Sequence, residues 1–335
     1  MIYSKQQWKR IEKICKDRKS HYDRYFIPKR SGGKREILAP SDELKNLQEL
    51  LLNKFLYARF IPSVYATGFI VDRSIVHNAR AHVGAAILVN VDVKNFFPSI
   101  TADMLGKDVF LDKLYSVEHN KIQQDIIRSG KRMWEIEPKD IEKKINKKDI
   151  TKKANLLTKL VTYPYKKKDA LPQGAPTSPA LSNIVCFEMD NMMSGLAKRN
   201  DAVYTRYADD LTFSSSKNKK LNRIIPVIKD LLKKYNFKAN ERKIHVNRQS
   251  GRMQVTGLVV NDKVSYGRGR WRIIRAALHN AKMKICNDKE LVPFDVMHYR
   301  GMAAYLNSFD KNKAEHINNE VDQIVDGIRE LKRSG

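Results

Sequence analysis

The sequence predicts an α+β fold in which short antiparallel strands are covered by amphipathic helices. Segments 22–38 and 203–216 each have the strand–turn–strand pattern of a hairpin. Segment 87–91 is a β-rich, largely apolar run, typical of a strand that is buried on both faces. Elsewhere, apolar residues recur at three- and four-residue steps, as on one face of a helix. A chain of 335 residues, 42% of them hydrophobic, can form two or three packed subdomains.

The N-terminal part is expected to consist of helices around one hairpin. The expected elements are a basic helix within 1–20, strands at 22–28 and 34–38, a helix beginning at Ser41 or Asp42, and a helix at 74–83. The turn of the hairpin contains Ser31-Gly32-Gly33. Its tip is basic and carries Lys29, Arg30, Lys34 and Arg35.

A long charged insertion follows, at about 105–168. It is partly helical in its periodicity, and its lysines are clustered. The clusters are Lys143-Lys144, Lys147-Lys148, Lys152-Lys153 and Lys166-Lys167-Lys168. The insertion could bind RNA, DNA or a protein partner, or it could simply be a solvated helical face.

The second half of the chain is expected to alternate between hairpins and helices. The expected elements are a loop at 171–179, a helix beginning at Ser178, the hairpin 203–216, a helix at 221–235, strands at 254–260 and 263–266, a basic helix at 267–284, and helices within 293–332.

Charge is the strongest compositional signal. Lys and Arg number 64 against 37 acidic residues, which gives a net charge of +27. Such a surplus exceeds what solubility requires and favours binding to a polyanion, most commonly a phosphate backbone.

Composition also argues against several classes of protein. The longest apolar stretch, 85–93, is too short to cross a bilayer, and the N-terminus has no signal-peptide pattern. An intracellular, cytoplasmic location without membrane partners is therefore expected. Cys15, Cys186 and Cys286 lack zinc-ligand spacing and are expected to be free thiols.

Three carboxylates stand at positions where apolar strands and tight bends rarely carry charge. Asp92 ends the strand 87–91, and Asp209 and Asp210 lie at the bend of the hairpin 203–216. Aspartate favours turns, so the pair at the bend has an ordinary explanation when taken alone. A separate apolar strand that also ends in Asp weakens this explanation, because acids beside such strands are costly unless they are paired or bind a metal.

If the strand and the hairpin are neighbours, three negative charges converge and cannot all stay ionised without a cation. Hard oxygen ligands of this kind select Mg²⁺, with Mn²⁺ as an alternative. Two such ions about 3.5–4 Å apart can hold both ends of an in-line phosphoryl displacement. We therefore expect Asp92, Asp209 and Asp210 to form a two-metal catalytic site.

Three motifs, in order along the chain, resemble those of reverse transcriptases. Segment 91–99 (VDVKNFFPS) is similar to their first palm motif, segment 171–179 (LPQGAPTSP) to their LPQG motif, and segment 207–210 (YADD) to their YxDD signature. The resemblance covers about residues 22–285 and implies a right-hand polymerase architecture. Its expected parts are an N-terminal helix and fingers at 1–90, a palm of antiparallel sheet and helices at 91–260, and a helical thumb at 261–335.

The resemblance also implies roles in binding the metal and the dNTP. The carbonyl of Val93 would be a further metal ligand. Phe97 falls where the family places the aromatic gate against a ribose 2′-OH, the alternative being a core aromatic next to Phe96. Gln173 and Gly174 would contact the incoming nucleotide and the template.

Arg35 matches the fingers residue that holds the triphosphate, with Lys29 and Lys34 as weaker candidates. The alternative for Arg35 is an exposed charge on a strand.

Two short strings narrow the resemblance to retron reverse transcriptases. Segment 78–82 (NARAH) is similar to their NAxxH motif and segment 255–257 (VTG) to their VTG motif. The implied RNA-contacting residues are Asn78, His82, Val255, Thr256 and Gly257. Outside the family, a histidine such as His82 more often belongs to a core or a helix surface, and the second string would be a strand entering a turn.

The same resemblance assigns RNA recognition to the basic helix of the thumb. Its arginine candidates are Arg268, Arg270, Arg272 and Arg275. Tyr266 and Trp271 could stack on bases or belong to the core.

A retron enzyme reverse transcribes part of its own structured non-coding RNA, priming from the 2′-OH of a guanosine to give branched msDNA. The implied partners are this RNA, the msDNA product, dNTPs and an effector protein in bacterial phage defence. Removal of RNA would be left to a host RNase H, because 1–335 has no evident nuclease domain.

Other interpretations remain open from the sequence. Another bacterial reverse transcriptase, of the group II intron or diversity-generating type, would share the three polymerase motifs. An RNA-templated RNA polymerase is disfavoured by Phe97 and the Gln173-Gly174 loop. A catalytically silent RNA-binding scaffold would explain the charge equally well, but not the carboxylates.

Overall fold

The structure is a computed structural model that describes residues 2–29, 32–129, 132, 135–165, 167–290 and 292–334. Arg30 and Ser31 of the predicted hairpin tip, and Lys166 of one lysine cluster, lie outside the described residues. Within the described ranges, no helix is both long and apolar enough to cross a lipid bilayer.

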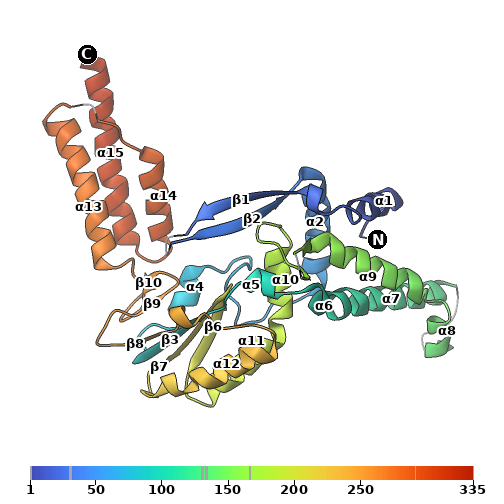
Figure 1. The fold of residues 1–335 in the computed structure, drawn as a ribbon. Coiled ribbons are helices and arrows are strands. Elements are labelled where there is room, and N and C mark those ends of the chain that lie inside the picture. The colour runs from blue at the N-terminus through green and yellow to red at the C-terminus, as the bar shows by residue number, and fades with distance from the viewer. Residues whose placement is uncertain are drawn as a thin grey trace.

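A four-stranded antiparallel sheet forms the centre of the fold (Figure 1). Its strands, in spatial order, are β6 (Val203–Tyr207), β7 (Asp210–Ser215), β3 (Ile87–Asp92) and β8 (His245–Arg248). The predicted hairpin 203–216 is confirmed as β6 and β7. Strand β8 was not expected, because its sequence is polar and largely exposed and lacks the alternation that indicates a strand.

Both faces of the sheet are covered, as the composition of β3 predicts. Ile87, Val89 and Val91 point into the main core, whereas Leu88 points into a second core on the other face. The helices beside the main core are α10 (Ser178–Val185), α11 (Phe187–Lys198) and α12 (Ile225–Lys234). The second core is closed by α4 (Ile75–Arg80) and the short strands β9 (Gln254–Val255) and β10 (Leu258–Val259).

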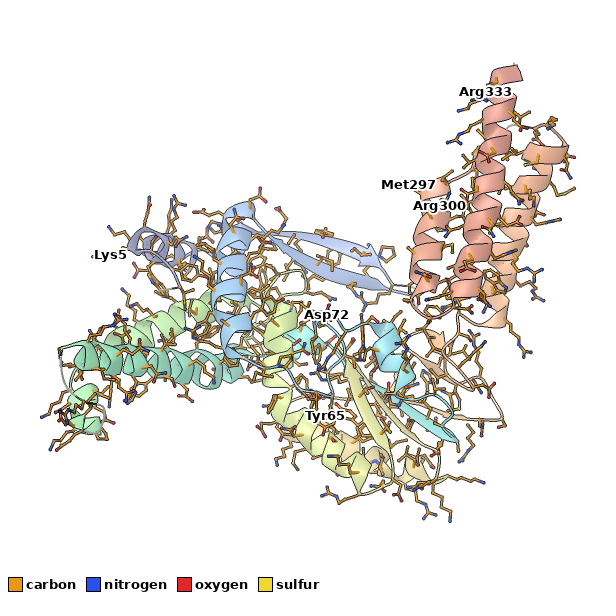
Figure 2. All side chains as sticks on the ribbon, turned by 180° about the vertical axis from the view of Figure 1, so that it is seen from behind. Lys5, Tyr65, Asp72, Met297, Arg300 and Arg333 are labelled. Carbon is orange, nitrogen blue, oxygen red and sulfur yellow. The ribbon has the colours of Figure 1, made fainter. Side chains whose placement is uncertain are left out.

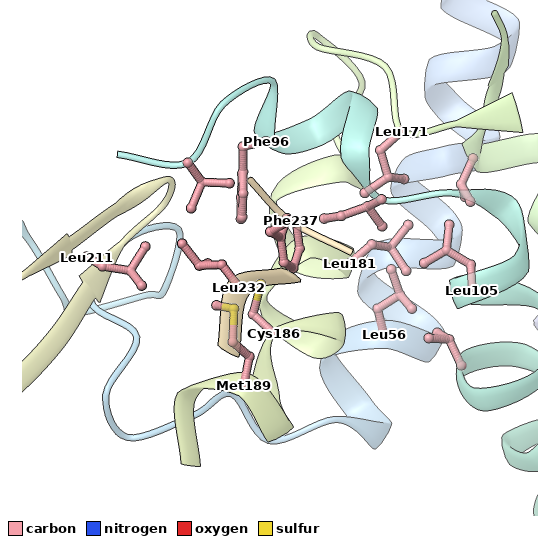
Figure 3. Close-up of a cluster of buried hydrophobic side chains, with 14 of the residues drawn as sticks. Leu56, Phe96, Leu105, Leu171, Leu181, Cys186, Met189, Leu211, Leu232 and Phe237 are labelled. Atoms are coloured by element: carbon pink, nitrogen blue, oxygen red, sulfur yellow. The ribbon is translucent and has the colours of Figure 1, made fainter. Parts of the chain in front are cut away.

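The main core joins the palm helices to the N-terminal part of the chain (Figure 3). Met189 from α11 lies with Leu232 from α12, Leu211 from β7 and Phe237, and Leu56 extends the cluster toward the N-terminal helices. Each of these side chains is almost wholly removed from solvent. Burying an aliphatic or aromatic side chain contributes about 1.5–3 kcal/mol, so this cluster ties fingers and palm together.

The N-terminal part forms a ribbon and a helical base. The ribbon consists of β1 (Tyr22–Pro28) and β2 (Lys34–Pro40), paired from Tyr22 opposite Pro40 to Pro28 opposite Lys34. The helices are α1 (Lys5–Ile14), α2 (Asp42–Leu51), α3 (Tyr57–Arg59), α5 (Phe96–Ser99) and α6 (Ala102–Leu105), with a π-helical segment at Leu52–Leu56. The ribbon extends away from this base toward the C-terminal helices (Figure 1).

The predicted insertion is a helical arm on the far side of the fingers (Figure 1). Its elements are a π-helical segment at Gly106–Leu111, α7 (Asp112–Arg128), α8 (Pro138–Glu142) and α9 (Lys147–Val161). A two-stranded turn of β4 (Tyr163–Pro164) and β5 (Asp169–Ala170) leads back to the palm. The outer half of the arm has a small isoleucine core of its own, built from Ile122, Ile126, Ile141, Ile145 and Ile150.

The C-terminal helices stand apart from the palm as a bundle with its own core. They are α13 (Arg268–Lys282), a π-helical segment at Met283–Asn287, α14 (Val296–Asn307) and α15 (Lys311–Ser334). In the view from behind, Met297, Arg300 and Arg333 lie on this bundle, and Lys5 marks the opposite end of the molecule (Figure 2). This arrangement fits the expected fingers, palm and thumb.

The predicted continuous strand at 254–260 is wrong. The chain pairs Val255 with Leu258 around a tight turn in which Thr256 and Gly257 have φ angles of 47° and 84°. A positive φ does not fit an extended strand, so the segment folds back on itself. Ser265 of the second predicted strand makes only an isolated bridge to Val259.

Candidate active site

The three predicted carboxylates meet at one end of the two central strands of the sheet, β3 and β7. Strands β3 and β7 pair antiparallel with Asp92 directly opposite Asp210. The backbone continues this pairing past the strand, because the amide of Val93 donates to the carbonyl of Asp209 at 2.9 Å. Residues more than a hundred positions apart in sequence are thus fixed next to one another by backbone hydrogen bonds.

The turn that carries Asp209 and Asp210 has an unusual backbone. Ala208 has a φ of 57°, in the left-handed region that costs a non-glycine residue about 1–2 kcal/mol. Gly68 lies directly behind it, and a Cβ atom at position 68 would come within 2.7 Å of the Ala208 nitrogen. Glycine at 68 therefore permits this close approach of two backbones.

Desolvation and charge repulsion raise the pKa values of two of the carboxylates. Desolvation in the recess and repulsion from Asp209 and Asp92 raise the pKa of Asp210 to about 6. Desolvation and repulsion from Asp92 also raise the pKa of Asp209, and the positive charges of Lys243 and Arg35 partly oppose this rise. The arrangement therefore favours the arrival of a cation.

Asp92 is already engaged by two neighbours. One carboxylate oxygen forms an ion pair with Lys243 Nζ at 2.7 Å, and the other accepts from Asn240 Nδ2 at 3.0 Å. The amide of Asn240 also donates to the Asp92 carbonyl at 2.8 Å. In the described part of the chain, no three His, Cys, Asp or Glu side chains are arranged to hold a metal ion as they stand.

Two of the predicted dNTP residues, Gln173 and Gly174, lie against strand β2, which also carries Arg35. The backbone carbonyl of Gln173 accepts a hydrogen bond from the backbone amide of Leu38 at 2.8 Å, which joins the LPQG loop to strand β2. Gly174 has a φ of 131°, and a Cβ atom there would lie 2.7 Å from the Leu38 carbonyl oxygen. Arg35, exposed on β2, is close enough to affect the pKa of Asp209.

Phe97 is half-buried between two other rings. Its centroid lies 5.4 Å from that of Phe96 and 6.0 Å from that of Phe69. The neighbouring Val93, whose carbonyl was expected to be a metal ligand, is buried beside Asp92. The structure therefore brings the three carboxylates together, with Val93 next to Asp92 and Arg35 close enough to act on Asp209, whereas the roles of Phe97, Gln173 and Gly174 stay predictions.

Comparison with known proteins decides the family. The profile of the family described as "Reverse transcriptase (RNA-dependent DNA polymerase)" matches residues 27–260, more than half of the chain. The chain belongs to the reverse transcriptase family.

Its curated relatives include several retron reverse transcriptases. The Mx162 and Mx65 enzymes of Myxococcus xanthus are each 33% identical, over 89% and 90% of this chain. The chain spans only 59% and 64% of the length of those two proteins. The Ec86 enzyme of Escherichia coli is 29% identical over 90% of this chain and 81% of its own length. The resemblance to retron enzymes is thus confirmed.

A solved telomerase from Candida albicans, in complex with a fragment of telomeric RNA, aligns over 90% of this chain and 61% of its own, with 12% identity and a TM-score of 0.42.

In this reverse transcriptase, the NAxxH residues are internal. Asn78 and His82 are both buried on the inner side of α4 and its following turn, so neither side chain reaches an RNA on the surface. His82 Nε2 lies 2.7 Å from Thr205 Oγ1 and its Nδ1 2.7 Å from Ser214 Oγ. The expected RNA contact is corrected accordingly. The two side chains instead form hydrogen bonds with Thr205 of β6 and Ser214 of β7 in the interior.

The protonation of this network follows from its partners. The Thr205 hydroxyl donates to Asn78 Oδ1 at 2.5 Å, so Thr205 must accept from His82 Nε2–H. His82 Nδ1 then accepts from the Ser214 hydroxyl. Desolvation lowers the pKa of His82 to about 3, which keeps the ring neutral in this arrangement.

The VTG turn lies beside the active site. Val255 is buried in the second core, whereas Thr256 and Gly257 are half-buried, and Thr256 Oγ1 donates to the Ile75 carbonyl at 3.2 Å. A cavity of about 400 Å³ separates the turn from the carboxylates. It is lined by Ile75, Asn90, Asp92, Tyr207, Asp210, Thr212, Lys243, His245, Thr256 and Gly257.

The arginines of the basic helix α13 are all exposed, but one has a structural contact. Arg270 donates to the Gly257 carbonyl at 3.1 Å and lies over the Tyr266 ring at 5.4 Å. It therefore joins the thumb helix to the VTG turn. Arg268, Arg272 and Arg275 remain exposed on the helix surface, available to a ligand.

Sequence reasoning missed the residues that support the carboxylates. Lys243 and Asn240 lie in a polar segment without a recognisable period, and Arg206 and Asp190 form a fully buried ion pair. The one available signal was Arg206 itself, a charged residue inside a strand of the predicted hairpin 203–216.

Proposed function

We propose that this chain is the RNA-directed DNA polymerase of a retron. The observation that supports it best is the pairing of Asp92 with Asp210, with Asp209 beside them, at the end of the two central strands of a reverse transcriptase palm. Three carboxylates at this point serve nucleotidyl transfer, in which a primer hydroxyl attacks the α-phosphate of a dNTP and pyrophosphate departs.

The donor set fits Mg²⁺, with Mn²⁺ as an alternative. Carboxylate oxygens are the ligands that hard divalent cations prefer. The pKa values of Asp209 and Asp210 are raised, so a bound cation would stabilise their ionised forms. Asp92, Asp209 and Asp210, with the Val93 carbonyl, would hold two ions. Bound there, the ions would lower the pKa of the primer hydroxyl and neutralise the triphosphate. Lys243 must then release Asp92.

The remaining residues position the substrates. Arg35 on β2 would contact the triphosphate, and the backbone of Gln173 and Gly174 would lie against the incoming nucleotide and the template. Phe97, held between two rings, would exclude a ribose 2′-OH and so select dNTPs.

We also propose the retron substrate and setting, based on the relatives. The RNA would be a cognate structured non-coding RNA, contacted by Arg268, Arg272, Arg275 and the Thr256-Gly257 turn. Synthesis would start at the 2′-OH of a guanosine and yield msDNA. An effector protein in phage defence and a host RNase H are the further partners, and the bacterial cytoplasm is the expected location.

Primer extension on an RNA template with Mg²⁺ tests the polymerase proposal. Asp209→Asn or Asp210→Asn should abolish DNA synthesis and leave RNA binding nearly intact, whereas Asp262→Asn, at an exposed position, serves as the control. Parallel loss of RNA binding would contradict the catalytic assignment. No dNTP incorporation by the wild-type chain would favour the RNA-binding scaffold instead.

The retron proposal has a separate test in the product. Mapping of the linkage between RNA and DNA should find a 2′–5′ branch at a guanosine. A DNA product without this branch would point to another bacterial reverse transcriptase.

A further inference from the structure

A fully buried ion pair lies directly beneath the catalytic turn. Arg206 Nε and Nη2 each donate to one oxygen of Asp190 at 2.8 Å, and neither side chain is exposed. The Tyr204 hydroxyl adds a third hydrogen bond to Asp190, at 2.8 Å. Desolvating two charges offsets most of their attraction, so stability alone is a weak explanation for such a pair.

The remaining Arg206 donor reaches the turn itself. Nη1 donates to the carbonyl of Ala208 at 3.2 Å and to Asn183 Oδ1 at 3.1 Å. Ala208 is the residue with the unfavourable φ, and it immediately precedes Asp209. A charge-assisted hydrogen bond to this carbonyl fixes the plane of the peptide that leads into the catalytic pair.

The opposite side of the turn is tied to the same network. Asn183 Nδ2 donates to the carbonyl of Gly68 at 3.0 Å, and Gly68 lies against the Ala208 nitrogen. Thr67 donates twice to the Arg206 carbonyl, from its amide at 2.7 Å and from its hydroxyl at 3.0 Å. The turn is therefore held between helices α10 and α11 and the loop at 67–68.

We infer that Arg206 is a positioning residue: through the Ala208 carbonyl it sets where the Asp209 and Asp210 carboxylates stand. Asp190 serves to orient the guanidinium. The hydrogen bonds that hold the turn exist without a metal. Only the expected effect on metal binding and DNA synthesis rests on the proposed metal-dependent function.

Two variants separate positioning from stability. Arg206→Lys keeps the charge beside Asp190 but lacks the planar fork that serves three partners at once. The double variant Arg206→Met/Asp190→Leu removes both charges, a replacement that buried ion pairs often tolerate without loss of stability. Tyr204→Phe is the matched control, since it removes one bond to Asp190 and leaves the Ala208 contact in place.

Three readouts are needed: amide exchange of 207–210 without metal, Mn²⁺ binding without nucleotide by electron paramagnetic resonance, and primer extension with Mg²⁺. In the folded Arg206 variants we expect faster exchange at the turn and Mn²⁺ binding weakened about 10- to 100-fold, the usual range for residues that support metal ligands. Tyr204→Phe should resemble the wild type in both.

The outcomes are distinguishable from those of the proposed function. If either Arg206 variant folds as judged by circular dichroism, yet exchanges and binds Mn²⁺ like the wild type, the inference is overturned. If the variants loosen the turn but the wild type extends no primer, the polymerase proposal fails while the positioning role stands.

Discussion

At the scale of single residues, Asp92 shows how the site keeps three acids together in the absence of metal. Lys243 supplies one positive charge and Asn240 one neutral donor, and both come from the segment that precedes β8. The lysine is half exposed, so it can leave when a stronger cation arrives. An exchangeable side chain therefore offsets part of the negative charge at this site.

Removing this lysine should strengthen metal binding. In Lys243→Met, no ammonium competes for Asp92, so we expect Mn²⁺ to bind several-fold more tightly in the absence of nucleotide. Isothermal titration calorimetry measures this directly. Lys229→Met is the control, because Lys229 forms its ion pair with Glu241 and not with Asp92. Weaker binding by the Lys243 variant would mean that the lysine organises the site instead of competing for it.

Asp210 should oppose folding at neutral pH. Because its pKa is raised to about 6, ionisation costs more in the folded state than in the unfolded chain, and stability falls as pH rises from about 4 to 6. Asp210→Asn should therefore raise the free energy of unfolding at pH 7 by roughly 1 kcal/mol. This value is smaller than the pKa shift alone implies, because the Asp210 side chain is partly screened by solvent. Urea titrations with EDTA at pH 7 and pH 4 check this: the gain should vanish at pH 4. An equal gain in Asp262→Asn would refute the local explanation.

At the scale of elements, the pattern of apolar residues predicted the strands that carry Asp92, Asp209 and Asp210. Asp92 follows a continuous apolar run and Asp209-Asp210 lie at the bend of a predicted hairpin, so these strands could be anticipated. Their pairing with each other was only a condition of the argument, because the pattern does not say which strands are neighbours. The same pattern failed for β8, which is polar, and for Thr256-Gly257, where backbone φ and not hydrophobicity decides the turn. Lys243 escaped prediction because its partner is distant in sequence.

The NAxxH helix segment should contribute to stability and not to RNA affinity. In His82→Leu, the hydroxyls of Thr205 and Ser214 lose a buried partner, at a cost of about 1–3 kcal/mol each. His77→Leu, on the exposed side of the same helix, is the control. Thermal unfolding and RNA binding by the folded fraction should be measured together. Weakened RNA binding at unchanged stability would restore the recognition role.

The same histidine gives stability a pH dependence. Its pKa is lowered to about 3, so protonation favours the unfolded chain, and its contribution to stability is lost as pH falls from about 6.5 toward 3. In His82→Leu, this part of the acid sensitivity should disappear in unfolding curves recorded between pH 7 and pH 4. An identical acid slope in the variant would show that other groups cause it.

At the scale of the whole molecule, the ribbon β1–β2 extends from the N-terminal helices toward the thumb bundle (Figure 1). The thumb has its own core, and Arg270 joins it to the palm turn at Gly257. The sequence predicted the three-part organisation through its motifs. It could not predict which arginines of α13 are free, because that depends on where the helix packs.

This difference among the arginines is testable by salt dependence. Arg272→Gln with Arg275→Gln should weaken RNA binding and lower the slope of log K against log salt by about 0.7–0.9 for each phosphate that the protein no longer neutralises. Arg270→Gln should instead lower thermal stability of the thumb and change the slope less. Filter binding from 50 to 300 mM salt, about the range where such slopes are resolved, provides the measurement. An unchanged slope in the double variant would remove α13 from the interface.

The helical arm is built as a separable module. Its outer half is held by five isoleucines of α7–α9 and the turn after α8, whereas Leu157, Leu160 and Val161 at the end of α9 belong to the main core. Leu111 and Leu114 pack against both cores, so a change to the outer half that keeps these two residues should leave the main core in place. Protein engineers could use this position to graft a foreign domain beside the fingers.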